Sequence, residues 1–503
     1  MEAIKKSHNK ENPFTDRDFP YDSDANNFHW VRPHQIVTSK RKEPVFISGG
    51  ASTLDISQGA LGDCWFLAAV QVFINNEKLA NNLLCLDRNS FKEGEYCGAF
   101  VFKFWRYGEW IDVIIDDTLP CRKTRGGRYR LKNLKVGKSG DEEEELNDVE
   151  FWPCLVEKAY AKLKGGYKNI EGGLTNEAFT DLCGATGRTE SLEQDCDLKE
   201  LFSRIENHLK CGGFVTCSAN GHDSHTSDYG IVGGHAYSVT RTARAFRGSA
   251  LLLSIRNPWG RTESKNLPYS DDSNIWKTHP KEKKRLQKKL VDDGEFFMEI
   301  SNFVKFFQRM TVSFMENDNL CSKTVKNLEQ NKKKVWNEIK SEHAVLPLGS
   351  GWRNRDNLPR INFTLPKKSK CIISFCIKNR RKDNIGGVHT GFCIFDRNSG
   401  ERVFSISRYE GKTAYENMRI VELEAGDYEM EPKSLKCLDK DYECFGRVWM
   451  LSELEALVDI DEPRSSFSGS SSSELEEKKE ELMEIYEDLL GKMDEIKDAI
   501  ENL

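Results

Sequence analysis

The 503-residue sequence has no long uncharged apolar run, no Cys-x-x-Cys pair and no excess of positive charge. A helix that spans a bilayer needs about 20 apolar residues, so the first absence argues against a membrane-spanning protein. The polar start, Met1 to His8, lacks the apolar region of a signal peptide. The 15 scattered cysteines favour a reduced, cytoplasmic protein over a disulfide framework. The formal net charge of -6 argues against nucleic acid as a partner.

Length and composition predict a chain of several folded parts. At 38% hydrophobic and 31% charged residues, it is typical of soluble globular proteins of roughly three domains. Apolar periodicity is helical before about residue 187 and strand-like afterwards. We predict an α+β fold with six parts: an N-terminal arm (1–35), a helix-dominated first half-domain (36–187), a β-rich second half-domain (188–315), an antiparallel β-sandwich (332–453), a Ser-rich linker (454–473) and an amphipathic heptad helix (474–503).

The C-terminal parts suggest interactions. Within 474–503 a leucine or isoleucine recurs every seven residues, which predicts a coiled coil and self-association. A single amphipathic helix docked on the chain's own surface fits the same pattern. Basic clusters at 367–370 and 378–382 indicate either contact with anionic phospholipid, and so recruitment to membranes, or solvated loops.

The stretch from Gln58 to Val70 predicts the first half of a catalytic site. Polar and small residues precede Cys64 and a continuous apolar run follows it, which is typical of a loop that enters a buried helix. Cys64 then lies in the first helical turn, where free N–H groups and the helix dipole favour a thiolate. The side-chain amide of Gln58 lies close enough in sequence to stabilise an oxyanion. The alternative is a cysteine that only packs in the helix.

A second pair of motifs offers a base. His235 begins one predicted strand and Asn257 ends the next, with a turn centred near Phe246 between them. Antiparallel pairing would place His235 opposite Asn257, where the amide oxygen can accept an imidazole N–H. That bond selects the tautomer and leaves the other ring nitrogen for a thiol. Trp259 would shield the bond from water. Taken singly, each residue is as readily a turn or surface residue.

Together these motifs resemble the calpain family of calcium-dependent cysteine endopeptidases. The resemblance is strong over residues 10 to 315 and weaker over the predicted sandwich, which is similar to the calpain C2-type domain. It implies a two-lobed, papain-like protease core that cleaves protein substrates, with Cys64 as nucleophile, His235 as base and acid, Asn257 as orienter, Gln58 as oxyanion donor and Trp259 as shield. The motifs that carry it are Gln58-Gly-Ala-Leu-Gly-Asp-Cys-Trp65, Glu157-Lys-Ala-Tyr-Ala-Lys162, Gly234-His-Ala-Tyr-Ser-Val-Thr240, Arg256-Asn-Pro-Trp-Gly260 and Asp293-Gly-Glu-Phe296.

The resemblance also implies two Ca²⁺ sites, since oxygen ligands suit this cation. In the first half-domain it implies Asp55, Glu150 and the carbonyls of Ser48 and Gly50 as ligands. In the second it implies Glu263, Asp271, the carbonyl of Val291, Asp293 and Glu295. Asp272 replaces Asp271 if no residue is inserted before it. Without the resemblance, these acids would be interpreted as solvated loop residues.

The sequence departs from the family at two places. Thr53 stands where calpains commonly carry an arginine that couples the two calcium sites. No EF-hand loop occurs after residue 452, so we do not expect the family's small EF-hand subunit as a partner. The leading prediction is an intracellular, calcium-activated cysteine endopeptidase that makes limited cuts in proteins. The alternative is a non-proteolytic scaffold whose β-sandwich responds to calcium or lipid.

Overall fold

The computed structural model describes residues 1–19, 28–37, 43–132, 134, 148–219, 228–286, 293–315, 334–346, 358–378, 390–406, 416–434 and 440–453. Helices and mostly antiparallel sheets confirm the predicted α+β class. The predicted linker and heptad helix (454–503) and Val291 lie outside the described residues. Within the described part of the chain, no helix is both long and apolar enough to cross a membrane.

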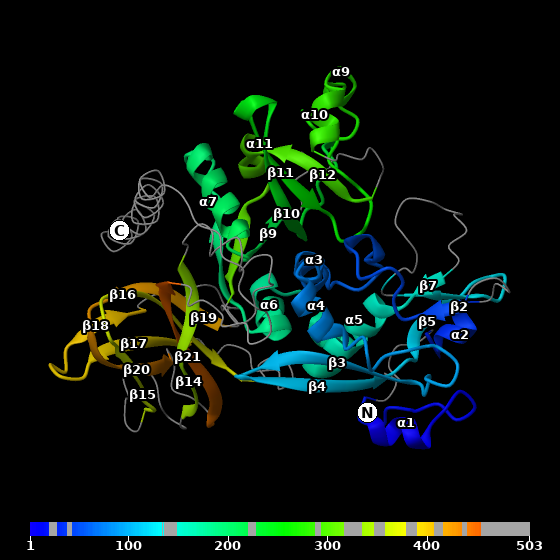
Figure 1. The fold of residues 1–503 in the computed structure, drawn as a ribbon, viewed down its shortest axis with the longest axis horizontal. Helices are drawn as coiled ribbons and strands as arrows, with labels where there is room; N and C mark the ends of the chain where they lie inside the picture. The colour runs from blue at the N-terminus through cyan, green and yellow to red at the C-terminus, as the bar shows by residue number, and fades with distance from the viewer. Residues whose placement is uncertain are drawn as a thin grey trace, which may run out of the picture.

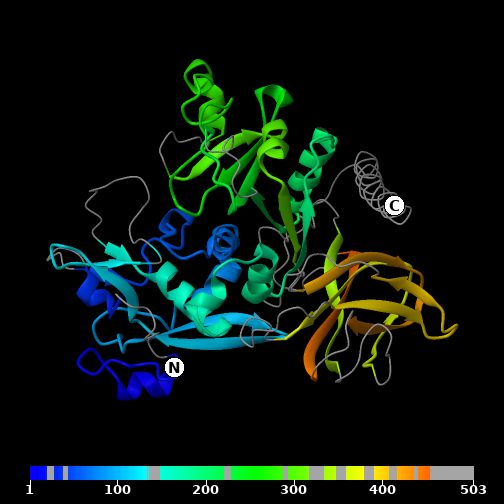
Figure 2. The same cartoon turned by 180° about the vertical axis from the view of Figure 1, so that it is seen from behind.

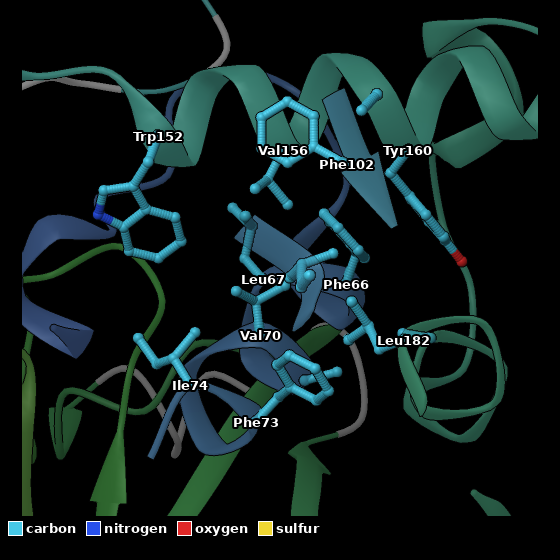
Figure 3. Close-up of a cluster of buried hydrophobic side chains, with 14 of the residues drawn as sticks. Phe66, Leu67, Val70, Phe73, Ile74, Phe102, Trp152, Val156, Tyr160 and Leu182 are labelled. Carbon is cyan, nitrogen blue, oxygen red and sulfur yellow. The ribbon is translucent and has the colours of Figure 1, made fainter. Parts of the chain in front are cut away.

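The first part of the chain packs around helix α3, and we call it the Cys64 lobe. Its elements are α1 (Glu2–Ser7), β1 (His29–Val31), α2 (Pro33–Ile36), β2 (Glu43–Val45), η1 (Thr53–Asp55), α3 (Cys64–Phe73), α4 (Glu77–Leu84), β3 (Ala99–Arg106), β4 (Glu109–Asp116), β5 (Leu119–Lys123), β6 (Tyr129–Leu131), β7 (Asp148–Glu150), α5 (Trp152–Lys164), η2 (Tyr167–Ile170) and α6 (Thr175–Cys183). Every α3 residue after Cys64 is buried. Figure 3 shows side chains of α5 facing those of α3 across this core.

The second part is built on one six-stranded sheet, and we call it the His235 lobe. Its strand order is β12-β11-β10-β9-β13-β8. Its elements are β8 (Thr186–Ser191), α7 (Leu198–Lys210), β9 (Phe214–Ala219), β10 (His235–Ala245), η3 (Phe246–Gly248), β11 (Ala250–Arg256), α9 (Ile275–Thr278), α10 (Pro280–Arg285), β12 (Glu295–Glu299), α11 (Ile300–Phe306) and β13 (Arg309–Phe314). It has a separate hydrophobic core, to which α7 and α11 contribute.

The third part consists of two four-stranded antiparallel sheets, and we call it the C-terminal sheet pair. The sheets run β14-β21-β16-β19 and β15-β20-β17-β18, and residues of both enter one core. The strands are β14 (Lys334–Leu346), β15 (Ile361–Leu365), β16 (Ser369–Ile377), β17 (Thr390–Asp396), β18 (Arg402–Ser405), β19 (Glu416–Leu423), β20 (Gly426–Ser434) and β21 (Tyr442–Glu453). The specific likeness to a C2-type domain stays a prediction.

Helix α3 joins the two lobes. In Figures 1 and 2 it lies between the sheet of the His235 lobe and the β3–β4 hairpin. Ser238 on β10 donates to Gln71 Oε1 on α3 at 2.9 Å, and both side chains are buried. The helix that begins at Cys64 therefore packs directly against the strand that begins at His235.

Candidate active site

Cys64 is the first residue of α3, as predicted. The carbonyl of Asp63 accepts the N–H groups of Phe66 and Leu67, at 2.9 and 3.1 Å, which starts the helix. The apolar run that follows is buried in the core, so packing of α3 determines the position of the cysteine. The Cys64 side chain remains partly exposed at this helix end.

The environment of Cys64 favours the thiol over the thiolate. Burial raises its pKa above the ordinary value, and the charge of Asp63 acts in the same direction. Backbone N–H groups of Ala236, Trp65 and Cys64 itself oppose the shift. The N–H groups at the helix start thus lower the pKa of Cys64, as the sequence predicted, but desolvation of the sulfur raises it by more. The Ala236 contact also places the sulfur beside the residue that follows His235.

His235 and Asn257 are brought together. His235 Nε2 lies 2.8 Å from Asn257 Oδ1. The orientation of the amide is determined independently, because Oδ1 also accepts the Trp259 N–H at 3.0 Å and Nδ2 donates to the Thr262 carbonyl at 3.0 Å. Since Oδ1 can only accept, Nε2 must carry the proton, and Nδ1 is left as the basic nitrogen. Burial lowers the pKa of His235 to about 4, so the ring is neutral at pH 7.

The route by which His235 reaches Asn257 differs from our expectation of a directly opposed pair. Strand β10 pairs with β11 so that Ser238 faces Arg256, and an irregularity between Val239 and Arg241 shifts the register. His235 itself pairs with Ala219 on β9. Asn257 lies just past the end of β11, and its side chain turns back to the histidine. The expected turn centre near Phe246 was wrong, because Ala245 faces Ala250 and the turn is therefore centred on residues 247–248. This register leaves Asn257 two positions short of the residue opposite His235.

Trp259 covers this pair. Its ring centroid lies 5.0 Å from that of His235 at an interplanar angle of 48°. The Trp259 carbonyl accepts Ser57 Oγ at 3.0 Å, and the Pro258 carbonyl accepts the Gln58 N–H at 2.9 Å. The loop that carries Trp259 is therefore held to the loop before Cys64, across the two lobes.

Gln58 lies near Cys64, but its side-chain amide faces the protein. Nε2 donates to the Leu61 carbonyl at 2.7 Å and to Asp63 Oδ1 at 3.1 Å. An amide nitrogen has two hydrogens, so both are engaged in this state. The role as oxyanion donor stays a prediction, and it requires one of these bonds to be exchanged for a bond to substrate.

The first predicted calcium loop brings Asp55 into contact with Trp152, two residues after Glu150. Asp55 Oδ2 accepts the N–H of Ser52 at 2.8 Å and the indole N–H of Trp152 at 3.1 Å. Glu150 ends β7, two residues before that indole, and pairs with Val45 on β2. Ser48 and Gly50 follow β2 in the sequence, and Gly50 has a φ of 93°. Two carboxylates and nearby carbonyls are the oxygen chemistry that Ca²⁺ takes.

The second predicted loop is held by its own hydrogen bonds. Glu263 Oε1 accepts the N–H groups of Asp293 and Gly294, each at 2.9 Å. Asp293 Oδ1 accepts the Glu295 N–H at 3.0 Å, whereas Glu295 Oε1 turns to the hydroxyls of Ser254 and Thr240.

The two candidates at positions 271 and 272 differ in the structure. Both carboxylate oxygens of Asp271 are buried. The exposed Asp272 instead accepts the Asn266 N–H and the Ser270 hydroxyl.

The donors of both loops fit calcium by type, but they do not form a complete site. In the described ranges, no group of three or more His, Cys, Asp or Glu side chains is placed to hold a metal ion. The ligand assignments therefore stay predictions. Thr53, at the position of the expected arginine, begins η1.

Sequence reasoning missed Arg256, which lies between the two acidic loops. It is fully buried, and its closest ion pair is to Asp293 Oδ1 at 3.9 Å. Burial lowers its pKa, while Asp293, Glu295, Glu263 and Asp55 oppose that shift. Carboxylates of both loops thus act on one buried cation. The motif Arg256-Asn-Pro-Trp-Gly contains this residue, but only the fold shows which acids surround it.

The basic clusters of the C-terminal sheet pair are only partly open to a membrane. Lys368 pairs with Glu422 and Glu424, at 3.4 and 3.0 Å, and Lys370 is buried. Lys378 lies near Glu443 and over the ring of Tyr107, and residues 379–382 lie outside the described part. Lys368 is therefore solvated beside two glutamates, whereas Lys370 lies buried in β16, so neither interpretation fits the whole of residues 367–370.

Comparison with known proteins identifies relatives of the chain. The model of the calpain family of cysteine proteases matches residues 10–314. The calpain-2 catalytic subunit of Macaca fascicularis is 38% identical over 314 residues, which cover 61% of this chain and 41% of that protein. Calpain-9 of Homo sapiens is 34% identical over 415 residues, covering 76% of this chain and 55% of that protein. The chain therefore spans only about half the length of these relatives.

Proposed function

The chain belongs to the calpain family of cysteine proteases, and we propose that it is a calcium-activated cysteine endopeptidase that makes limited cuts in cytoplasmic proteins. The observation that carries this proposal is the bond between His235 Nε2 and Asn257 Oδ1, together with the contact between the Cys64 sulfur and the backbone N–H of Ala236, the residue after His235. A helix-start thiol, a neutral imidazole and an orienting amide are the parts that acyl transfer by cysteine needs.

The reaction begins from a neutral pair, because burial raises the pKa of Cys64 and lowers that of His235. As the sulfur attacks the substrate carbonyl, its proton passes to His235 Nδ1. The imidazolium is stabilised by Asn257 Oδ1, which accepts its Nε2–H. His235 then protonates the departing amine, and the acyl group stays on Cys64. A water molecule, deprotonated by His235, releases the acid and restores the thiol.

The oxyanion needs donors that are strongest in the transition state. The N–H of Cys64, at the open end of α3, is one donor, and Gln58 is proposed as the other. Gln58 Nε2 donates to the Leu61 carbonyl at 2.7 Å and to Asp63 Oδ1 at 3.1 Å. We therefore expect the longer bond, to Asp63, to break when Gln58 donates to the oxyanion.

Calcium regulation is proposed through the two acidic loops, because both lead into the site. Ser57, two residues after Asp55, holds the carbonyl of Trp259. Gly294, next to Asp293, accepts the Asn257 N–H at 2.8 Å. A β-carbon at Gly294 would lie 2.9 Å from the Asn257 carbonyl, so the two segments are in close contact. Bound calcium would neutralise the carboxylates of Asp55, Glu150, Glu263 and Asp293 and hold these loops in one conformation.

Cleavage of casein during a calcium titration tests the proposal, with Cys64→Ser as the matched variant. We expect calcium-dependent cleavage by the wild-type chain and none by the variant. No cleavage by either chain at millimolar calcium would overturn the proposal and support the scaffold alternative. Calcium-independent cleavage by the wild-type chain would support the proposed peptidase activity and contradict the proposed activation by calcium.

A further inference from the structure

Two buried carboxyl groups lie directly behind Cys64. Asp63 precedes the cysteine and is 0% exposed, and Glu157, on α5, is 2% exposed. The two side chains are hydrogen-bonded to each other although they come from different elements. The catalytic mechanism described above does not use this pair.

The bond between them requires a proton. Ionised carboxylates only accept hydrogen bonds, so one member of a bonded pair must be protonated. Within the described residues, no N–H or hydroxyl group donates to Asp63 Oδ2. Two adjacent buried charges would also repel each other strongly. Consistent with a retained proton, burial raises the pKa of Asp63 to about 7.

The pair is connected to the site in two ways. Asp63 Oδ1 accepts from Gln58 Nε2 at 3.1 Å, so it determines where the proposed oxyanion donor lies. Its charge also raises the pKa of the Cys64 thiol, after the larger effect of burial. The protonation state of the pair therefore acts on both the amide and the sulfur.

We propose that Asp63 and Glu157 share a single proton and thereby act as positioning residues for Gln58 and Cys64. This inference rests on the proposed peptidase function. Loss of the proton leaves two buried negative charges, which separate by repulsion and shift Gln58. It also adds a second negative charge beside Cys64. Both effects weaken the transition state more than substrate binding, so kcat falls while KM changes little.

Other titratable groups face the pair. Tyr167 and Cys154 lie in its field, and burial raises the pKa of each well above its ordinary value, so both stay neutral. Glu171, the residue after η2, is an exposed carboxylate. Its negative charge raises the pKa of Asp63. The proton shared by Asp63 and Glu157 is accordingly the one expected to leave near neutral pH.

The test compares pH profiles of kcat for casein cleavage. In Glu157→Gln, an amide N–H replaces the shared proton and cannot ionise. We expect wild-type kcat to fall about 25-fold between about pH 6.5 and 8.5, as for one group that ionises near pH 7, and the variant to fall less than about twofold. In Asp63→Asn the donor is on the other side chain. This variant's amide N–H would donate to Glu157, and its amide oxygen would still accept from Gln58. It should reproduce the flattened profile if Glu157→Gln does not fold.

Glu171→Gln is the matched control, since it removes the neighbouring charge without touching the pair. Its profile should keep the wild-type fall but move to lower pH, because the Glu171 charge raises the pKa of Asp63. Profiles of wild type, Glu157→Gln and Asp63→Asn that superimpose, in chains that cleave casein, would overturn the inference.

The rate at which iodoacetamide alkylates Cys64, followed by mass spectrometry on its peptide, gives a readout without peptidase turnover. We expect the pH dependence of this rate to differ between wild type and Glu157→Gln. If no chain cleaves casein, the proposed function fails, and the alkylation profiles still decide whether the proton is shared. Identical alkylation profiles would then reject the pair as well.

Discussion

The catalytic centre and the two acidic loops are held together in different ways. At the centre, His235 from β10 bonds Asn257, which lies after β11, and α3 is bound to β10 through Gln71 and Ser238. In the loops, Asp55 accepts the nearby Ser52 N–H, and Glu263 accepts the N–H groups of residues 293 and 294. The centre is thus assembled by side-chain contacts between packed helices and strands, whereas the loop carboxylates Asp55, Glu263 and Asp293 accept hydrogen bonds mainly from backbone N–H groups.

In the proposed function, this difference would separate the chemistry from its regulation by calcium. Side chains at the ends of packed helices and strands are placed accurately without a ligand. Carboxylates on loops can adjust, so a cation that binds them can alter the residues they adjoin, here Ser57 and Gly294. Changes at the centre should therefore remove activity, and changes in the loops should alter stability or calcium response.

The largest effect is expected from His235→Gln. The variant keeps a polar side chain beside Asn257 but has no base, so kcat should fall by at least about 10³-fold. His208→Gln is the matched control, since His208 also belongs to the His235 lobe but is only partly buried and contacts the Ser313 carbonyl. Casein cleavage measures both. A His235→Gln chain with more than a tenth of wild-type activity would contradict the proposed base.

Arg256→Met should destabilise the loops most. Removing a buried cation leaves Asp293 and its neighbours uncompensated, at an expected cost of about 3 kcal/mol. Urea unfolding in EDTA measures this loss, and added calcium should restore part of it. Arg241→Met is the control: Arg241 is 40% exposed and lies 3.9 Å from Glu295, so it should cost less than about 1 kcal/mol. Equal losses in the two variants would argue against Arg256 as the shared cation.

Mild acid should destabilise the His235 lobe. Burial lowers the pKa of both His235 and His208 to about 4, so the unfolded chain binds more protons between pH 4 and 6.5. Stability therefore falls as pH decreases through this window, by about 2 kcal/mol per histidine between pH 6.5 and 5. Urea unfolding at the two pH values checks this. His208→Gln should remove about half of the change, and an unaltered slope would contradict the assignment.

The smallest effect is expected from Asp55→Asn. The amide oxygen can still accept from Ser52 and Trp152, but the site loses one negative charge. Half-maximal casein cleavage should need about tenfold more calcium, equivalent to ~1.4 kcal/mol. Unfolding in EDTA should be unchanged. Asp87→Asn, at an exposed position, is the control. The same calcium requirement in both variants would remove Asp55 from the ligand set.

Much of the site could be predicted because its signals are local. The change from polar residues to an apolar run located the start of α3 at Cys64, and short apolar stretches located β10 and β11. The thiolate expected for Cys64 was not found, because the degree of burial depends on residues far away in the chain. Strand β14 was missed because charged residues such as Lys340 and Glu342 interrupt its apolar pattern.

The sequence by itself determined the order of the proposed nucleophile, base and orienting amide, and the family to which the chain belongs. Only the tertiary structure decided that Asn257 meets His235 from beyond the strand end, that Arg256 lies between two acidic loops, and that Asp63 bonds Glu157. The physical reason is that helix starts and strand periodicity depend on neighbours in sequence. Register, desolvation and charge pairing depend on which distant elements pack together.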